Sequence, residues 1–199
     1  MEDRSRLARR AAGRRTLTRS PRFRIGIIAD THGLYDTAIE RYFAGVTEIF
    51  HAGDIGGRNV IERLTRLAPV TVVSGNVDNY EDSGFPRRII VRRGGCKIAI
   101  CHILYERGNM TKEARTWLDR EQPDICVFGH SHRPTLDRYG KTVLFNPGSA
   151  GPKRFSLPRG LGILSSKHGR VIPQLISLPD RAEPAIRTVT KNIFLGRGR

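Results

Sequence analysis

The stretch Phe50-His51-Ala52-Gly53-Asp54 is a short apolar run that ends in a glycine and a carboxylate. Such a run is typical of a buried parallel strand, and open α/β sheets place their chemistry at the carboxyl ends of strands. We expect Asp54 to project from that end, with Gly53 allowing the backbone to turn tightly beneath it. Alone this pattern is weak evidence of function, because an aspartate after a strand most often caps the next helix.

The rest of the chain predicts a mixture of parallel strands, helices and hairpins. Three strand-like runs come first, at 23–29, 47–50 and 70–73. Helical apolar spacing follows the first two, which favours a parallel sheet covered by helices. Three hairpins are expected later, at 88–92 with 97–100, 135–138 with 142–145, and 161–165 with 170–177. A helix is expected over 111–121 and a further strand over 125–128.

Length and charge predict one domain between two basic tails. We expect tails over 1–22 and 181–199 and a folded domain over 23–180 of the 199 residues. The net charge is +16, but the first 24 residues hold nine arginines against two acidic residues. Residues 181–199 hold five basic residues against one acidic residue, which leaves +5 for the segment between. The folded part is only mildly basic, so nucleic acid is a weakly supported partner.

Cysteine usage and hydropathy favour a cytoplasmic protein. Cys96, Cys101 and Cys126 lie in or beside apolar runs, where free cysteine acts as a small buried hydrophobe. They form no Cys-x-x-Cys pair and leave one cysteine over in any disulfide scheme, which favours a reducing compartment. No apolar run is long enough to cross a bilayer, so we expect no membrane partner. The arginine-rich start also lacks the apolar segment of a secretory signal.

Seven candidate metal ligands follow apolar strands, so one twisted sheet could bring them together. They are Asp30, His32, Asp54, Asn76, His102, His130 and His132. Carboxylate, amide and imidazole ligands suit Mn, Fe, Zn or Ni rather than a thiolate-bound structural zinc. A carboxylate can also bridge two cations about 3.5–4 Å apart, the spacing used in two-metal phosphoryl hydrolysis. The set therefore predicts two metal sites that share Asp54.

Each of these residues also has an ordinary structural interpretation. Asp30 or Thr31 could cap the first helix, and Asn76 beside a glycine could be a turn residue. His102 on a strand is more often a core histidine than a ligand. The segment Gly129-His130-Ser131-His132 is harder to explain in this way, because two imidazoles at one strand exit would crowd each other without a cation. The joint pattern favours a metal centre although several single residues do not.

Two further residues are assigned supporting roles. His51 faces away from Asp54 by strand alternation, so we interpret it as a structural residue behind the ligands. Asp78 is expected to orient a ligand through a hydrogen bond.

In chain order, the strand-end motifs resemble those of the calcineurin-like metallophosphoesterase superfamily. These motifs are Asp30-Thr31-His32, Gly53-Asp54, Gly75-Asn76, His102 and Gly129-His130-Ser131-His132. The small size, Gly75-Asn76-Val77-Asp78 and Asn146-Pro147-Gly148-Ser149 are similar to its compact bacterial and archaeal phosphodiesterase branch. The resemblance covers roughly 23–180. It implies an α/β (α+β) fold, a four-layer αββα sandwich with a dinuclear site at one end.

Carried over by position, the resemblance implies two divalent ions and assigns their ligands. One ion would be bound by Asp30, His32, Asp54 and His132, and the other by Asp54, Asn76, His102 and His130. Manganese is expected, with nickel, iron or zinc as alternatives. Asp54, Asn76 and His102 would form the catalytic set, with a metal-bound hydroxide attacking phosphorus in line.

Two positions depart from the family pattern. Val77 stands where larger members usually have a histidine that contacts the phosphate and can protonate the leaving group. Because a general acid contributes about 10²–10⁴-fold, we expect a preference for diesters with good leaving groups, or an acid supplied from elsewhere. Ile103 and Leu104 follow His102 where the family usually has glycine and histidine, so the substrate pocket should differ in contour there.

Three functions remain in competition. The leading hypothesis is a dinuclear metal-dependent phosphodiesterase or phosphatase acting on a small phosphoester. A nuclease or cyclic-nucleotide phosphodiesterase that uses the basic tails is the second. The third is a non-catalytic protein-binding scaffold, against which the seven intact ligand positions argue. The sequence leaves a homo-oligomer open.

Overall fold

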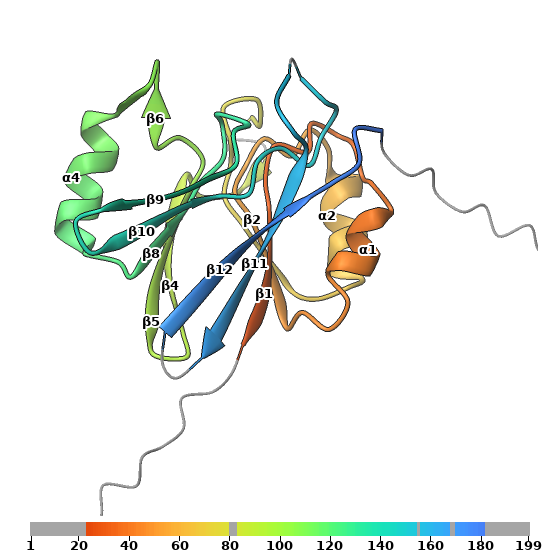
Figure 1. Cartoon of the computed structure of the whole chain (residues 1–199). Helices are drawn as coiled ribbons and strands as arrows, with labels where there is room; N and C mark the ends of the chain where they lie inside the picture. Colours follow the sequence, from red (N-terminus) through yellow and green to blue (C-terminus); the bar gives the residue numbers. More distant parts are fainter. Residues whose placement is uncertain (1–22, 80–82, 155, 168–169, 182–199) are drawn as a thin grey trace, which may run out of the picture.

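The computed structural model describes residues 23–79, 83–154, 156–167 and 170–181. The tails predicted over 1–22 and 181–199 lie outside the described residues, apart from Arg181. Two five-stranded sheets dominate the described part, with helices beside them (Figure 1). Among the described residues, no helix is long and apolar enough to span a bilayer.

The first sheet has the strand order β12-β11-β1-β2-β3. Its strands are β1 (Arg24–Ile28), β2 (Glu48–His51), β3 (Val70–Val72), β11 (Gly160–Lys167) and β12 (Arg170–Ser177). β1, β2 and β3 are parallel, and β11 runs antiparallel to β1 and to β12. Two helices connect the parallel strands, α1 (Ala38–Tyr42) and α2 (Arg58–Thr65). The predicted strand–helix alternation is therefore confirmed in this half.

The second sheet has the order β4-β5-β8-β10-β9. Its strands are β4 (Arg88–Arg93), β5 (Cys96–Cys101), β8 (Ile125–Val127), β9 (Thr135–Tyr139) and β10 (Thr142–Asn146). β5, β8 and β10 are parallel, with β4 and β9 as antiparallel edges. The helix α4 (Lys112–Glu121) begins after Thr111, whose side chain accepts a hydrogen bond from the N–H of Ala114.

A small hairpin of two short strands was not predicted. β6 (Tyr105–Glu106) and β7 (Asn109–Met110) pair between β5 and α4. Two-residue strands are too short to show an apolar alternation, so the sequence pattern does not reveal them.

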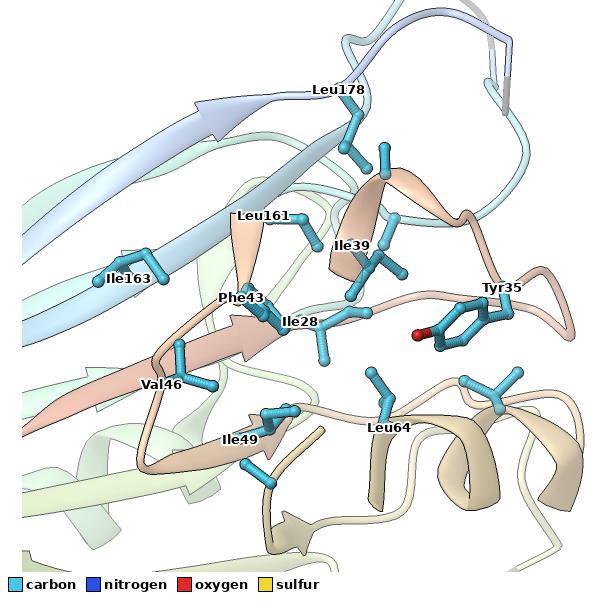
Figure 2. Packing of buried hydrophobic residues seen from close by; sticks show 14 of the residues in the cluster. Ile28, Tyr35, Ile39, Phe43, Val46, Ile49, Leu64, Leu161, Ile163 and Leu178 are labelled. Carbon is cyan, nitrogen blue, oxygen red and sulfur yellow. The ribbon is translucent and has the colours of Figure 1, made fainter. Parts of the chain in front are cut away.

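Three buried apolar clusters separate four layers. One lies between the first sheet and its helices, where Ile28 and Ile49 meet Ile39, Phe43 and Leu64 (Figure 2). The second lies between the sheets and includes side chains from β1, β2, β5, β8 and β10. The third packs α4, through Trp117 and Leu118, on the outer face of the second sheet. This order of helix, sheet, sheet and helix confirms the predicted αββα sandwich.

The apolar cluster between the sheets aligns strands of the first sheet with strands of the second sheet. The central strands β1 and β2 of the first sheet face β5 and β8 of the second across this cluster. A candidate ligand lies within three residues after the end of each of these strands. The fold therefore brings loops from both sheets to one end of the sandwich.

Candidate metal centre

The structure gathers all seven sequence-predicted ligands at the carboxyl ends of five strands. The first sheet contributes Asp30 and His32 after β1, Asp54 after β2 and Asn76 after β3. The second sheet contributes His102 after β5, and His130 and His132 after β8. The contacts described below join the two sets across the interface between the sheets.

Asp54 lies at the middle of the group and faces histidines on both sides. Its Oδ1 is 3.2 Å from His102 Nε2 and accepts a 3.0 Å hydrogen bond from the N–H of Val77. Its Oδ2 is 3.8 Å from His32 Nε2. Gly75 packs so closely that a Cβ there would overlap this carboxylate. The two oxygens of one carboxylate are thus directed at two different imidazoles.

Asp30, His32 and His132 form one potential metal-binding group, with ligand atoms within 4.8 Å of one another. His32 Nε2 lies 3.1 Å from His132 Nε2, and His132 Nε2 lies 3.4 Å from Asp30 Oδ1. The Asp30 carboxylate also accepts hydrogen bonds of 3.1 Å from the N–H of His130. That bond holds the loop after β8 against the loop after β1.

Asp30, Asp54 and His102 form a second such group, which Asn76 and His130 extend. Asn76 Oδ1 lies 3.0 Å from His102 Nε2 and 2.8 Å from His130 Nδ1. Asp30 therefore belongs to both groups by proximity, with its Oδ1 4.0 Å from His102 Nε2.

The position of the proton on the His102 ring indicates whether these side chains could bind a cation. Its Nδ1 lies 2.8 Å from the backbone oxygen of Ala52, so the proton on Nδ1 donates there. In the neutral ring, the lone pair of Nε2 then faces the oxygens of Asp54 and Asn76. Several acceptors directed at one point require a cation or an extra proton between them. The residues fit a divalent metal ion on this ground.

Charge within the group shifts the pKa values of its members. Burial alone would raise the pKa of Asp54, but the protonated ring of His102, through a hydrogen bond and its charge, and the N–H of Val77 hold it at about 2. Burial alone would lower the pKa of His102, but the carboxylates of Asp54 and Asp30 raise it overall. Burial, followed by the charge of Arg154, lowers the pKa of His32, and burial lowers that of His130. Metal ligands bind as deprotonated carboxylates and neutral imidazoles, so acid should compete with metal here.

The backbone of the centre is held in an unusual conformation. Seven described non-glycine residues have positive φ, and five of them are candidate ligands: Asp30, His32, Asp54, His130 and His132. Non-glycine residues rarely adopt this left-handed backbone conformation, and those that do cluster at functional sites. Gly53, with φ of +88°, supplies the expected tight turn before Asp54.

His51 and Asp78 support the loops rather than facing the cluster of ligand atoms. His51 is buried; its Nδ1 accepts from the N–H of Gly53 at 3.2 Å, and its Nε2 lies 3.0 Å from Thr31 Oγ1. Burial lowers the pKa of His51 to about 4, so the ring is neutral near pH 7.

Asp78 accepts hydrogen bonds from three backbone amides. Its Oδ1 lies 2.9 Å from the nitrogen of Ile55 and 3.2 Å from that of Gly56, and its Oδ2 lies 2.8 Å from that of Gly75. It therefore orients the segments that carry Asp54 and Asn76, and does so through the backbone rather than through a ligand side chain.

Asp30 does not cap the first helix. The N–H of Ala38 at the start of α1 donates instead to Asp36 Oδ1, at 2.9 Å. Asp36 also forms a buried ion pair of 2.8 Å with Arg159, whose other N–H groups donate to backbone oxygens, including that of Gly151. An arginine in a loop gives no sequence signal of burial, so this pair was not predicted.

Two further supports come from the end of β10 and the loop that follows it. Asn146 Nδ2 donates to the backbone oxygen of Gly129 at 2.8 Å, and Ser149 Oγ donates to that of Asp30 at 2.8 Å. The sequence marked this segment only as a motif of the resembled family. The structure shows that it braces the loops after β8 and β1.

Two clefts border the centre. A cleft of about 680 Å³ is lined by Asn76 and His102 together with Arg87, Arg88 and Trp117. A second cleft, of about 460 Å³, is lined by residues that include His130, Arg107, Arg133 and Tyr105. The β6–β7 hairpin contributes Glu106 to the first cleft and Tyr105 and Arg107 to the second, so it separates them.

Two known proteins are similar to this chain in sequence. A probable metallophosphoesterase of Methanocaldococcus jannaschii is 36% identical over 134 residues, which are 63% of this chain and 67% of that protein. A probable metallophosphoesterase of Methanothermobacter thermautotrophicus is 33% identical over 67% of this chain and 81% of that protein.

Solved structures show the same fold. A predicted phosphoesterase of Streptococcus pneumoniae has a TM-score of 0.60 at 26% identity, covering 79% of this chain and 99% of its own. Vps29 from Entamoeba histolytica, solved with zinc, has a TM-score of 0.61 at 21% identity, covering 78% of this chain and 99% of its own. The sequence profile of the calcineurin-like phosphoesterase superfamily domain matches residues 23–169. The chain therefore belongs to the calcineurin-like phosphoesterase superfamily, and its candidate ligands support a metal-dependent phosphoesterase.

Proposed function

We propose that this protein is a dinuclear metal-dependent phosphodiesterase in which Asp54 is shared by two divalent ions. The observation that carries the proposal is the position of the Asp54 carboxylate. One oxygen faces His102 and the other faces His32, and these histidines belong to different ligand groups. A carboxylate placed in this way can bind two cations at once.

The remaining ligands divide between the two ions as the family resemblance implies. Asp30, His32 and His132 would hold one ion with Asp54, while Asn76, His102 and His130 would hold the other. When bound, such ions supply Lewis-acid stabilisation of the phosphate and lower the pKa of water. Manganese is the metal we propose, because oxygen and imidazole ligands suit it and the family resemblance favours it.

A preference for diesters is supported by the surroundings of the centre. Val77 is 52% exposed and carries no proton that could be given to a leaving group. Poor leaving groups should therefore react slowly, since general acid catalysis is missing at this position. The two clefts flank the centre on the Asn76 side and on the His130 side. A phosphodiester has two substituents, and each could occupy one cleft.

The test uses Asp54→Asn, with Glu62→Gln on the exposed surface of α2 as the matched carboxylate control. With manganese, the wild type and the control should release nitrophenol from bis(p-nitrophenyl) phosphate, and EDTA should stop both. Asp54→Asn should be inactive while its circular dichroism and cooperative unfolding stay intact. Among aryl and alkyl diesters, rates should fall as the pKa of the leaving group rises.

Two results would contradict the proposal. Full activity of Asp54→Asn would show that this carboxylate is not shared by the reactive ions. A wild type without metal-dependent turnover on a panel of monoesters and diesters, tried with Mn, Ni, Fe and Zn, would favour a non-catalytic scaffold of the same fold.

A further inference from the structure

The smaller of the two clefts has a one-sided charge. It lies between the β6–β7 hairpin, the loop after β8 and Leu157. Its two charged lining residues are Arg107 and Arg133, and no carboxylate is among the lining residues that the structure describes. The larger cleft differs, because Arg87 and Arg88 there are accompanied by Glu106 and Glu113. Of the two clefts, the smaller one therefore has charged lining residues of positive sign only.

Arg107 and Arg133 are available to a ligand. Within the described part of the chain, neither guanidinium has a hydrogen bond or ion pair to another side chain. Arg133 directly follows the candidate ligand His132, and Arg107 stands at the tip of the hairpin. Guanidinium groups bind phosphate oxygens through two parallel N–H bonds, which makes arginine well suited to this anion.

Arg107 occupies a turn position for which another residue type is preferred. Arg107 and Gly108 form the two-residue loop between Glu106 and Asn109, with φ of +48° and +81°. Positive φ at both positions is the pattern of a type I′ turn, which strongly prefers asparagine first and glycine second. Seven described non-glycine residues have positive φ. Five of them are candidate ligands, and Gln122 is the residue at which α4 ends. Arg107 is the remaining one, and it lies in the hairpin turn.

The rest of the lining fits the part of a substrate that joins two anionic groups. Tyr105 and Leu157 are half-buried, and Phe128 packs against the ring of Tyr105 with centroids 5.8 Å apart. Such surfaces pack against a sugar or another mostly apolar spacer. His130 borders both this cleft and the candidate metal centre, so the two are continuous.

We propose that this cleft is a subsite for a second phosphate of the substrate, bound by Arg107 and Arg133. The ester that is hydrolysed would lie at the metal centre, and the second phosphate would lie one sugar-sized unit away. The substrate class is thus a nucleotide-like phosphodiester that carries a further phosphate. This proposal rests on the proposed function, since it assigns one arm of that substrate.

The test compares two substrates that differ only in the second phosphate. They are thymidine 5′-(p-nitrophenyl phosphate) with and without a 3′-phosphate, hydrolysed by the full-length protein with manganese. We expect the wild type to have a kcat/KM about tenfold higher for the 3′-phosphorylated compound, as one or two charged hydrogen bonds would give. Arg107→Asn and Arg133→Ser should each reduce this preference several-fold.

Two controls distinguish loss of the subsite from loss of folding and from a change in net charge. Asparagine is favoured at this turn position, so Arg107→Asn should unfold at a temperature no lower than the wild type while losing the preference. Arg138→Asn removes an exposed arginine from β9, outside the cleft, and should keep the wild-type ratio. If the wild type turns over both substrates equally, the subsite proposal is overturned and the phosphodiesterase proposal stands.

A binding measurement tests whether the subsite exists without depending on hydrolysis. In EDTA, the full-length protein should bind thymidine 3′,5′-bisphosphate several-fold more tightly than thymidine 5′-phosphate by calorimetry. Arg107→Asn should remove most of that difference, whereas Arg138→Asn should keep it. Equal affinities in the wild type would overturn the subsite whether or not the protein hydrolyses either diester. Absence of hydrolysis with the affinity difference intact would instead contradict the proposed function.

Discussion

At the scale of single residues, the centre combines strained backbone with tightly held side chains. A left-handed conformation costs a non-glycine residue roughly 1–2 kcal/mol. Five candidate ligands adopt it, so the surrounding loops must contribute several hydrogen bonds to hold them. The bond from the N–H of His130 to Asp30 and the bond from Ser149 Oγ to the Asp30 backbone are two of these. The meeting of the candidate ligands could be predicted from their positions at strand ends, but this bracing could not, because its donors come from distant segments.

His51 gives a pH dependence that can be measured. In the folded protein burial lowers its pKa to about 4, while an unfolded histidine has a pKa of about 6.5. Between these values the unfolded chain binds the proton more readily, so the folded state loses stability as pH falls below 6.5. At pH 5 this loss should be about 2 kcal/mol relative to pH 7.5, and below pH 4 it should increase no further.

The measurement is urea unfolding in EDTA at pH 7.5 and pH 5, for the wild type and for His51→Gln. The variant should be less stable at pH 7.5, because the contacts to Thr31 and Gly53 change. Its further loss on acidification should be smaller than that of the wild type by about 2 kcal/mol. Equal losses would show that His51 titrates normally in the folded protein. Other groups, including His102 with its raised pKa, contribute equally to both proteins and cancel in the comparison.

At the scale of elements, the strand ends were predictable and the connections between them were not. The expected strands over 23–29, 47–50 and 70–73 correspond to β1, β2 and β3, because buried parallel strands are continuous apolar runs. The β6–β7 hairpin escaped prediction, since its strands are only two residues long and its turn has arginine where asparagine is preferred. That hairpin divides the space beside the centre into two clefts, so the sequence could predict that the candidate ligands meet but not the shape of the clefts beside them.

The loops after β2 and β3 are joined by Asp78, and its removal should affect stability and metal binding together. Asp78→Ala leaves the amides of Ile55, Gly56 and Gly75 without their acceptor. Hydrogen bonds to a charged group contribute about 1.5–3 kcal/mol each when buried, and these are partly exposed. We expect a loss of about 2–4 kcal/mol in unfolding free energy. Loss of a residue that orients metal ligands typically weakens metal affinity about 10–100-fold, and we expect a weakening of this kind in Asp78→Ala.

Urea unfolding and calorimetric titration with manganese measure the two effects. Asp180→Ala is the control, since this exposed carboxylate pairs with Lys153 at the surface. It should change stability by less than about 1 kcal/mol. Asp78→Ala with unchanged manganese affinity would show that the two loops are positioned without this carboxylate.

At the scale of the whole molecule, the centre joins the two sheets of the sandwich. Asp54 comes from the first sheet and His102 from the second, and their ligand atoms lie 3.2 Å apart. The ordered motifs predicted this meeting, because each follows a strand. What they could not predict is that Asp30 approaches both ligand groups, or that Arg159 and Asp36 form a buried pair nearby. Those features depend on how the sheets and loops pack against one another, and a local sequence pattern does not predict that packing.

Because the candidate ligands come from both sheets, a metal bound at the centre should stabilise the whole fold rather than one loop. A ligand that binds only the folded state, at 100 times its dissociation constant, adds about 2.7 kcal/mol per site. For a chain of this size, 1 kcal/mol raises the melting temperature by about 2–4 °C, so each site that manganese saturates should raise it by about 5–10 °C over EDTA. Asp54→Asn should lose most of this shift and Glu62→Gln should keep it, as followed by scanning calorimetry. The shift should also shrink at pH 5, because protons compete for imidazoles that bind metal in their neutral form. A rise of the same size in Asp54→Asn would place the stabilising ion elsewhere on the protein.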